Sequence, residues 1–171
     1  MKHEMFVIKD IEKAQDFSTT TVALITSSSD DRINVMSAEW TIRSSIEPFM
    51  ITIFIGYERG SYEMIKKSGE FGLSYCSERQ GELAHIAGNY SIRDTDKFST
   101  GKFRAFPSSM IKPPLIENAI CAFECRVESE FRVGDHAAFN GIVLEGYYSK
   151  GEKPLVFHGG KFHQIGDIIK H

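Results

Sequence analysis

The sequence lacks most features that mark a specialised class of protein. Only three of its 171 residues are cysteine, an odd number with no C-x-x-C pair, whereas secreted disulfide frameworks normally use an even number in a shorter chain. Twenty Lys and Arg against 23 Asp and Glu leave a net charge of −3, which argues against a nucleic-acid partner. No apolar run is long enough to span a membrane, and residues 1–5 contain no apolar signal-peptide segment. We therefore expect a reduced, cytoplasmic protein.

Several catalytic motifs are missing as well. No G-x-G-x-x-G follows an expected strand, and the sequence has neither a phosphate-binding G-x-x-x-x-G-K-[ST] loop nor a G-x-S-x-G nucleophile elbow. The six histidines show no spacing typical of a metal site, and no cysteine has the sequence context of a nucleophile. We expect no metal and no Rossmann-type sheet.

The composition is that of one globular domain, which we expect to span residues 1–171. Hydrophobic residues make up 42% and charged residues 25%, and a chain of this length folds without a disulfide or metal. Strand-like segments follow one another instead of alternating with helices, which favours a mostly antiparallel β-barrel with short helices packed outside. The expected strands are 18–26, 33–44, 49–55, 70–76, 119–130, 137–148, 154–158 and 161–166, and the expected helices are 61–67 and 77–87.

The segment 119–130 shows the clearest alternation of apolar and charged residues. Cys121 and Cys125 fall on its apolar face, and Glu124 falls on the opposite face with other charged residues. Two strand residues four apart lie about 13 Å from each other, too far for a disulfide. We expect all three cysteines to be free thiols that pack as small apolar side chains.

Three segments of small, polar and aromatic residues fit the strand pattern poorly and are candidates for a binding site. Residues 34–41 have small side chains at Ser37 and Ala38, where a backbone can approach a flat ligand, although a hairpin strand with a packed Trp also explains them. Residues 57–62 place an Arg beside a helix start, which is either a phosphate site or a surface turn with an ordinary Ser cap. Residues 88–98 form a long polar loop, either functional or a solvated connector.

Together, in this order and spacing, these segments resemble the flavin reductase-like proteins, which bind FMN in a split β-barrel. The resemblance covers about residues 18–165, and its most specific pieces are the Ser-Gly-Glu-Phe and Asp-Lys-Phe sequences that end at Phe71 and Phe98. It implies a mostly β, antiparallel split barrel of Greek-key type, a homodimer with the flavin near the subunit interface, and hydride transfer with a nicotinamide nucleotide. The matching pieces are 34–40, 59–62, 65–71, 88–91, 96–98, 134–136 and 154–160.

The resemblance also implies which residues hold the cofactor and the substrate. Backbone N–H groups toward the pyrimidine edge of the flavin ring are expected from Met36, Ser37, Ala38, Ile55 and Gly56. The phosphate is assigned to Arg59, Ser61 and Lys97, the walls of the ring to Trp40, Tyr62 and Phe98, and further cofactor contacts to Asn34, Thr41 and Ser91. The candidates for contact with the nicotinamide nucleotide are His136 and His158, with a surface turn as the simpler interpretation of His136.

The function that these observations favour is an FMN-dependent NAD(P)H:flavin oxidoreductase. Two alternatives stay open: an FMN-holding electron carrier reduced by a partner protein, and an interaction domain that binds no flavin. Oxidation of NADH or NADPH by the purified protein separates the first two. An absorbance band at about 450 nm, expected of any oxidised flavin, excludes the third.

Overall fold

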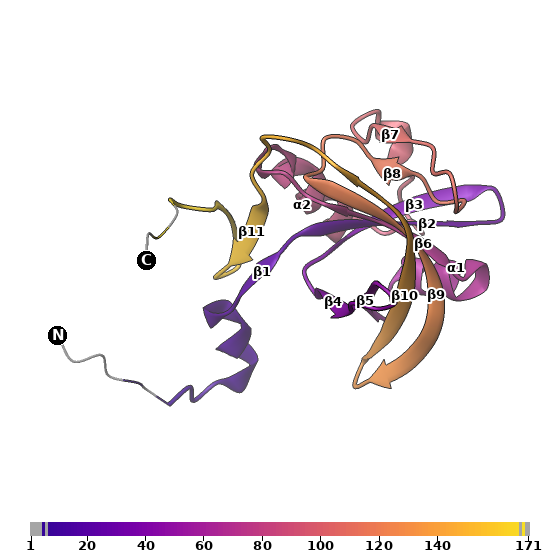
Figure 1. Ribbon diagram of the computed structural model, residues 1–171. Coiled ribbons are helices and arrows are strands. Elements are labelled where there is room, and N and C mark those ends of the chain that lie inside the picture. Colours follow the sequence, from indigo (N-terminus) through magenta and orange to yellow (C-terminus); the bar gives the residue numbers. More distant parts are fainter. Residues whose placement is uncertain (1–4, 6, 168, 170–171) are drawn as a thin grey trace.

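The computed structural model describes residues 5, 7–167 and 169 (Figure 1). Residues 1–4, which contribute to the expectation that no signal peptide is present, lie outside the described residues. Within the described part, no helix is both long enough and apolar enough to cross a membrane. Every strand pairing in this part is antiparallel, so the protein is mostly β and antiparallel, as predicted.

A seven-stranded sheet forms the body of the molecule, in the order β3-β2-β6-β9-β10-β5-β4. Its strands are β2 (Ala23–Ser29), β3 (Arg32–Ala38), β4 (Thr41–Ser45), β5 (Met50–Gly56), β6 (Glu70–Tyr75), β9 (Cys121–Val133) and β10 (His136–Tyr148). The expected strands 49–55, 70–76 and 137–148 match β5, β6 and β10 to within one residue at each end.

The expected strand 33–44 is two strands, and the break between them shapes the molecule. β3 ends at Ala38 and β4 begins at Thr41, yet these strands lie at opposite ends of the hydrogen-bond order. The sheet therefore curls until its two edges approach each other at the link, Glu39 and Trp40. No pairing joins β3 to β4 among the described strands, so the curled sheet is open at this point and a closed barrel is not formed.

The expected strand 18–26 is also divided, because the chain passes from one sheet into another. β1 (Thr19–Thr21) pairs with β11 (Leu155–His158), and β11 pairs with β12 (Lys161–Gln164), in a separate three-stranded sheet. Figure 1 shows this small sheet beside the main body, with the 3₁₀ helix η1 (Ile11–Phe17) projecting from it.

Both expected helices are present. α1 (Gly60–Ser68) ends at Gly69, whose φ of 70° is the left-handed conformation expected of a glycine stop. α2 (Gly81–Asn89) follows the 3₁₀ turn η2 (Glu78–Gln80), where the side-chain oxygen of Gln80 accepts the N–H of Ser77 at 3.0 Å. The remaining short elements are η3 (Phe98–Thr100), β7 (Ala105–Phe106) and β8 (Leu115–Ile116).

The core consists of two apolar clusters on opposite faces of the sheet. Consecutive residues of β2 point into different clusters, Ile25 into the first and Leu24 into the second, and both are fully buried. The first cluster includes Phe71 of β6 and Ile65 of α1, whereas the second includes Ala87 of α2. A strand that is buried on both faces has apolar residues at consecutive positions. This is why β2 lacks the alternation of apolar and charged residues seen in β9.

Glu124 of β9 lies on the charged face of the strand, as predicted, but not in solvent. It is fully buried, and its carboxylate accepts the N–H groups of Ser109 (2.9 Å) and Met110 (2.6 Å) and the hydroxyl of Tyr147 (2.7 Å). Burial alone would raise the pKa of Glu124, but these hydrogen bonds outweigh it and lower the pKa. The carboxylate therefore ties the loop before β8 to the sheet.

The three cysteines are free, which confirms the prediction from the sequence. Cys76 and Cys125 are buried, and burial raises the pKa of Cys76 to about 12. Burial also raises the pKa of Cys125, so burial favours the protonated thiol at both positions.

Gly141 of β10 tests how closely the first cluster is packed. A Cβ built on Gly141 would lie 2.7 Å from the ring of the fully buried Phe71. We therefore expect Gly141→Ala to lower the free energy of unfolding by about 1–3 kcal/mol, measured by urea denaturation. Gly81→Ala is the matched control, because its Cβ would meet nothing closer than 3.8 Å. Equal stability of the two variants would contradict this packing.

Candidate functional site

A cavity of about 230 Å³, here called the Trp40 cavity, opens where the two edges of the curled sheet meet. Its walls come from the end of β3, the link to β4, the end of β5, the turn before α1 and the start of β10. The lining residues are Met36, Ser37, Ala38, Glu39, Trp40, Phe54, Gly56, Arg59 and His136.

Backbone groups of two strands are available in the walls of this cavity. β3 is an edge strand, so the N–H and C=O groups on its outer side have no partner strand, and Ser37 and Ala38 cover them only with small side chains. On β5, the pairing with β4 stops at Ile53 and is followed by the hydrogen bond from the Phe54 N–H to the Trp40 carbonyl, which leaves Gly56 beyond the end of that ladder in the cavity wall. Free backbone donors and acceptors in a cavity wall suit a flat ligand with a hydrogen-bonding edge.

Trp40 and His136 form the aromatic side of the cavity, with ring centroids 4.7 Å apart and planes tilted by 43°. The carbonyl of Trp40 accepts the N–H of Phe54 at 3.1 Å, which anchors the link to β5. His136 lies opposite Gly56 in the β10–β5 register, so no partner side chain competes with its ring. A hydrogen bond of 2.7 Å joins its Nδ1 to the carboxylate of Asp135 and lowers the pKa of Asp135.

Arg59 brings a positive charge to the cavity. Its side chain is 55% exposed, its Nε lies 3.2 Å from a carboxylate oxygen of Glu58, and its Nη1 donates to the carbonyl of Gly88 at 3.4 Å. Gly88 belongs to the last turn of α2, where the helix dipole favours a cation. The guanidinium is thus oriented by two segments yet open to solvent, which leaves it free to bind an anion.

A second cavity of about 340 Å³ adjoins the Trp40 cavity and shares Ser37, Glu39 and Arg59 with it. We call it the hairpin groove, because the β11–β12 hairpin lines one side and α2 lines the other. The hydroxyl of Thr20 donates to the carboxylate of Glu39 at 3.1 Å and holds it at the boundary of the two cavities. The other lining residues are Val22, Ala84, His85, Gly88, Asn89, Phe157, Gly160 and Phe162.

The structure brings part of the predicted site together and separates the rest. The predicted residues that line the Trp40 cavity are Met36, Ser37, Ala38, Trp40, Gly56, Arg59 and His136. Two others belong to the core: Ile55 is fully buried, and Tyr62 packs against Phe139. The hydroxyl of Thr41 donates to that of Tyr75 at 3.1 Å, and Thr41 does not line the cavity.

Asn34 and Ser61 join β3 to the start of α1. The amide nitrogen of Asn34 donates to the hydroxyl of Ser61 at 2.8 Å, and both side chains are buried. The amide oxygen of Asn34 is buried without a hydrogen-bond partner in the described part of the chain. Ser91 lies in the loop that covers the start of α1, where its hydroxyl accepts the N–H of Arg93 at 3.2 Å.

Lys97 and Phe98 face the interior of the loop that follows α2. Lys97 is only 1% exposed, and its ammonium donates to the carbonyl of Tyr90 at 2.8 Å. Burial lowers the pKa of Lys97. Phe98 packs on Phe103 with ring centroids 5.9 Å apart. In this arrangement both residues fix the shape of the loop, and neither lines the Trp40 cavity or the hairpin groove.

The hairpin groove contains residues that the sequence did not single out. His158 is exposed outside both cavities, with its Nδ1 3.0 Å from the carbonyl oxygen of Ser18, whereas its neighbour Phe157 lines the groove. Phe157 pairs across the hairpin with Phe162, at a ring separation of 5.6 Å. Neighbouring residues of a strand point to opposite faces. The alternation within 154–158 was therefore a signal that Phe157 and His158 point in opposite directions. Glu39 was missed although it lies inside the first candidate segment.

The donor set of the Trp40 cavity fits a flavin. An isoalloxazine ring needs an aromatic or apolar surface to pack on and hydrogen-bond partners along its pyrimidine edge, and Trp40 and the unpaired edge of β3 line the same cavity. Its ribityl phosphate needs a cation, and Arg59 lines the same cavity. Fold and site together are those of an antiparallel β protein with a cavity suited to a flavin.

Comparison with known proteins identifies the family. A model described as "Flavin reductase like domain" matches residues 16–166. The chain belongs to the flavin reductase-like family, which confirms the resemblance seen in the sequence.

Individual relatives match most of the length of this chain at moderate sequence identity. The uncharacterized protein PYRAB12460 of Pyrococcus abyssi is 34% identical over 148 residues, which are 86% of this chain and 83% of that protein. The NADH-dependent FMN reductase AsuE2 of Streptomyces nodosus subsp. asukaensis is 24% identical over 162 residues, 92% and 85% of the two chains. The solved structure of the NADH:FAD oxidoreductase SgcE6 of Streptomyces globisporus has the same fold, with a TM-score of 0.87 at 20% identity, covering 98% of this chain and 100% of that one.

Lys97→Met tests the interior role of Lys97. The substitution keeps an apolar stem of similar length but removes the hydrogen bond to the Tyr90 carbonyl, so we expect the free energy of unfolding to fall by about 1–3 kcal/mol. Lys102→Met is the control, because Lys102 is half exposed in a surface ion pair with Glu82, and it should cost roughly 0.5 kcal/mol or less. The free energy of unfolding of both variants is measured by urea denaturation. A Lys97→Met protein as stable as the parent would refute the interior role of Lys97.

Proposed function

We propose that the protein is an NAD(P)H:flavin oxidoreductase that binds FMN with the ring in the Trp40 cavity. The observation that carries this proposal is that an unpaired strand edge, the Trp40–His136 aromatic side and the exposed cation of Arg59 meet in one cavity. The relatives AsuE2 and SgcE6, whose names state NADH and a flavin, support the choice of both reactants.

In this proposal the protein binds and orients, and the cofactor supplies the redox chemistry. A bound flavin would supply the two-electron redox chemistry, with the hydride coming from the nicotinamide nucleotide and the proton from solvent. The backbone N–H groups of residues 36–38 and of Gly56 would bind the pyrimidine edge, where a reduced flavin would gather negative charge, whereas the fully buried Ile55 does not line the cavity. Trp40 packs on the ring, and Arg59 binds the phosphate.

The residues predicted for the phosphate side divide into two groups. Arg59 binds the phosphate directly. Ser61 and Lys97 act as positioning residues, because the hydroxyl of Ser61 is engaged by Asn34 and the ammonium of Lys97 by the Tyr90 carbonyl. Together they hold the start of α1 and the loop after α2 in the positions that frame the site.

The hairpin groove is the proposed site of the nicotinamide nucleotide. It adjoins the Trp40 cavity through Ser37, Glu39 and Arg59, so a nucleotide bound there reaches the exposed side of the flavin ring. His136 remains the proposed contact for the nicotinamide. His158 lies outside the groove and would act only by supporting the β11–β12 hairpin.

We also propose that the protein is a single domain, that it works in the cytoplasm, and that it passes electrons from reduced flavin to a partner protein. We further propose that it forms a homodimer. Several large apolar side chains on or next to β4 and β9 are exposed, including Ile42 (57%), Ile46 (76%) and Phe131 (57%), and a second copy would cover them. Light scattering that shows a stable monomer at micromolar concentration would contradict the dimer.

The activity test follows NADH and NADPH oxidation at 340 nm by the purified protein with FMN added. We expect catalytic oxidation of at least one of the two nucleotides, with reduced FMN as the product. FMN that binds tightly but is not reduced by either nucleotide would instead indicate an electron carrier. Absence of flavin binding would refute the proposal altogether.

Arg59→Ala tests the assignment of the phosphate. A charge-assisted hydrogen bond contributes about 1.5–3 kcal/mol, so the substitution should weaken FMN binding roughly 10- to 150-fold. Binding of riboflavin, which has no phosphate, should hardly change. Arg79→Ala is the control, because Arg79 is a 78% exposed arginine paired with Glu152 outside both cavities. Equal weakening of FMN and riboflavin in titrations of the apoprotein would show that Arg59 shapes the ring pocket instead.

A further inference from the structure

Glu39 lies at the boundary of the Trp40 cavity and the hairpin groove and lines both of them. It belongs to the short link between β3 and β4, and its side chain is partly buried. The hydroxyl of Thr20 donates to one of its carboxylate oxygens at 3.1 Å. No ion pair among the described residues involves Glu39. A carboxylate that is held in a cavity wall without a paired cation attracts a positively charged ligand.

The register of the small sheet shows on which side Thr20 holds this carboxylate. Thr20 of β1 lies opposite Phe157 of β11, and Phe157 lies opposite Phe162 of β12. Residues directly opposite each other on paired strands point to the same face of the sheet. Phe157 and Phe162 line the hairpin groove but not the Trp40 cavity. Thr20 therefore holds the carboxylate of Glu39 toward the hairpin groove, where the nicotinamide nucleotide is proposed to bind.

The other walls of the hairpin groove also favour a flat cation. The rings of Phe157 and Phe162 are 5.6 Å apart, and aromatic faces attract cations that lie over them. On the other side, residues from Ala84 to Asn89 in the C-terminal half of α2 line the groove, and the C-terminal end of a helix carries partial negative charge. The Nδ1 atom of His85 accepts the side-chain N–H of Asn89 at 3.3 Å, so this nitrogen holds no proton in the described arrangement.

Hydride transfer creates a flat cation at this place. The dihydronicotinamide ring is neutral, and it becomes a pyridinium cation when a hydride, which is a proton with two electrons, leaves its C4 for the flavin. The two rings must stack for this transfer, so the nicotinamide ring lies where the hairpin groove meets the Trp40 cavity. Glu39 lines this junction. Fixed negative charge beside a ring that becomes positive lowers the energy of the transition state.

We propose that Glu39 is a catalytic residue whose carboxylate contacts the nicotinamide ring and stabilises the positive charge that the ring gains as the hydride leaves. Thr20 is then a positioning residue, because it acts on the ring only through Glu39. This inference rests on the proposed function, which places the flavin ring in the Trp40 cavity and the nucleotide in the hairpin groove. In that function Arg59, the cation shared by the two cavities, is engaged by the flavin phosphate and does not neutralise Glu39.

The test compares two nucleotides that differ in the charge of the nicotinamide ring. NAD⁺ has a pyridinium ring, whereas tetrahydro-NADH has a neutral ring that cannot give up a hydride. Both are titrated calorimetrically into the FMN-loaded parent protein and into FMN-loaded Glu39→Gln, which keeps the size of the side chain and an acceptor for Thr20. We expect Glu39→Gln to weaken NAD⁺ binding roughly 10- to 100-fold and tetrahydro-NADH binding by less than about twofold. If the parent oxidises NADPH, the corresponding phosphorylated pair is used.

Two further measurements separate the charge of Glu39 from its shape. The kcat for nucleotide oxidation should fall roughly 10- to 100-fold in Glu39→Gln while KM changes less than about twofold, because the positive charge develops only toward the transition state. Thr20→Val removes the hydroxyl and keeps the side-chain shape. It should weaken NAD⁺ binding about threefold and leave tetrahydro-NADH binding unchanged, since the carboxylate is then less firmly held.

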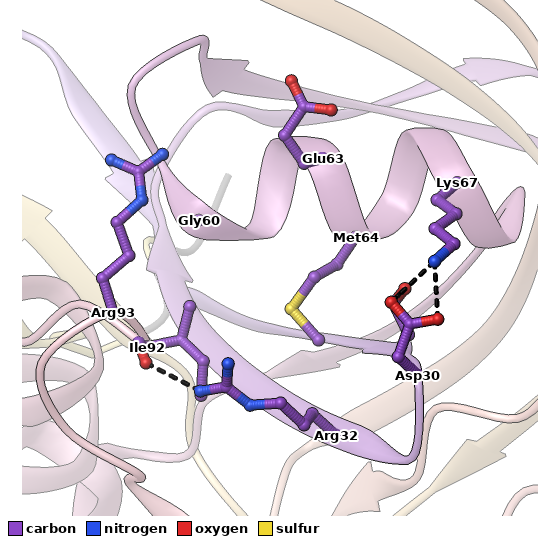
Figure 2. A pocket seen from close by; sticks show the side chains of 9 residues that line it. Asp30, Arg32, Gly60, Glu63, Met64, Lys67, Ile92 and Arg93 are labelled. Atoms are coloured by element: carbon purple, nitrogen blue, oxygen red, sulfur yellow. Dashed lines mark hydrogen bonds and ion pairs between the residues drawn. The ribbon is translucent and has the colours of Figure 1, made fainter.

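Glu63→Gln is the matched control. Glu63 lies on α1 beside a separate cavity of about 330 Å³, whose other lining residues include Arg32 and Arg93 (Figure 2). This cavity shares no lining residue with the Trp40 cavity or the hairpin groove. The substitution removes the same charge from the protein at an exposed position, where solvent and salt screen it. Neither nucleotide affinity nor kcat should change by more than about twofold.

Three results would overturn the inference. Equal weakening of NAD⁺ and tetrahydro-NADH in Glu39→Gln would show that Glu39 shapes the groove and does not sense the charge of the ring. Unchanged affinity for both would place the ring away from Glu39. An effect of Glu63→Gln as large as that of Glu39→Gln would show that only the net charge of the protein matters. Failure of the parent protein to bind FMN, or to oxidise either NADH or NADPH, is a different result, because it refutes the proposed function before Glu39 is tested.

Discussion

The hydrogen bond from the Phe54 N–H to the Trp40 carbonyl is the contact on which the site depends. It holds the two-residue link between β3 and β4 against β5, at the point where the curled sheet brings its edges together. It extends the β4–β5 ladder by one residue, so the chain leaves the edge formed by β3 and joins the opposite edge of the sheet. The link leaves the edge of β3 unpaired and places the Trp40 ring beside His136, and these two features make the cavity.

Buried polar contacts hold the loops that frame this cavity. The Asn34–Ser61 hydrogen bond joins β3 to α1, and the Lys97 ammonium holds the loop after α2 through the Tyr90 carbonyl. Each of these groups is removed from water, so breaking one contact leaves a buried polar atom unpaired. The start of α1 and the loop beside it are therefore held in place, and Arg59 lies in the wall of the Trp40 cavity.

Local signals in the sequence predicted most of the fold. Gly69 marked the end of α1, the Ser77–Gln80 pair marked the start of the second helical segment, and apolar alternation marked β9. The break after β3 was not predictable in this way, because Thr41 and its neighbours are as strand-like as those before Glu39. The contact that makes the break joins residues fourteen positions apart.

The candidate site was likewise predictable where its residues are neighbours in the sequence, and not where the site depends on contacts between distant residues. The structure brings the candidates Met36, Ser37, Ala38 and Trp40 into one cavity, and their small and aromatic side chains stand together in the sequence. Lys97 was assigned to the phosphate from the family resemblance, and only the fold shows that a backbone carbonyl binds its ammonium in the interior. Arg32 and Arg93 are sixty-one residues apart, so no local pattern predicts that they share a cavity.

Trp40 provides the most direct test of the central claim, because it is the only tryptophan in the chain and it lines the proposed flavin cavity. The measurement is a titration of the apoprotein with FMN, with tryptophan emission and flavin absorbance followed together. Strong quenching that saturates at about one flavin per chain is the predicted result, since a flavin packed on the indole accepts its excitation energy. Flavin absorbance that reports binding while the emission of Trp40 stays unchanged would place the flavin elsewhere and contradict the account.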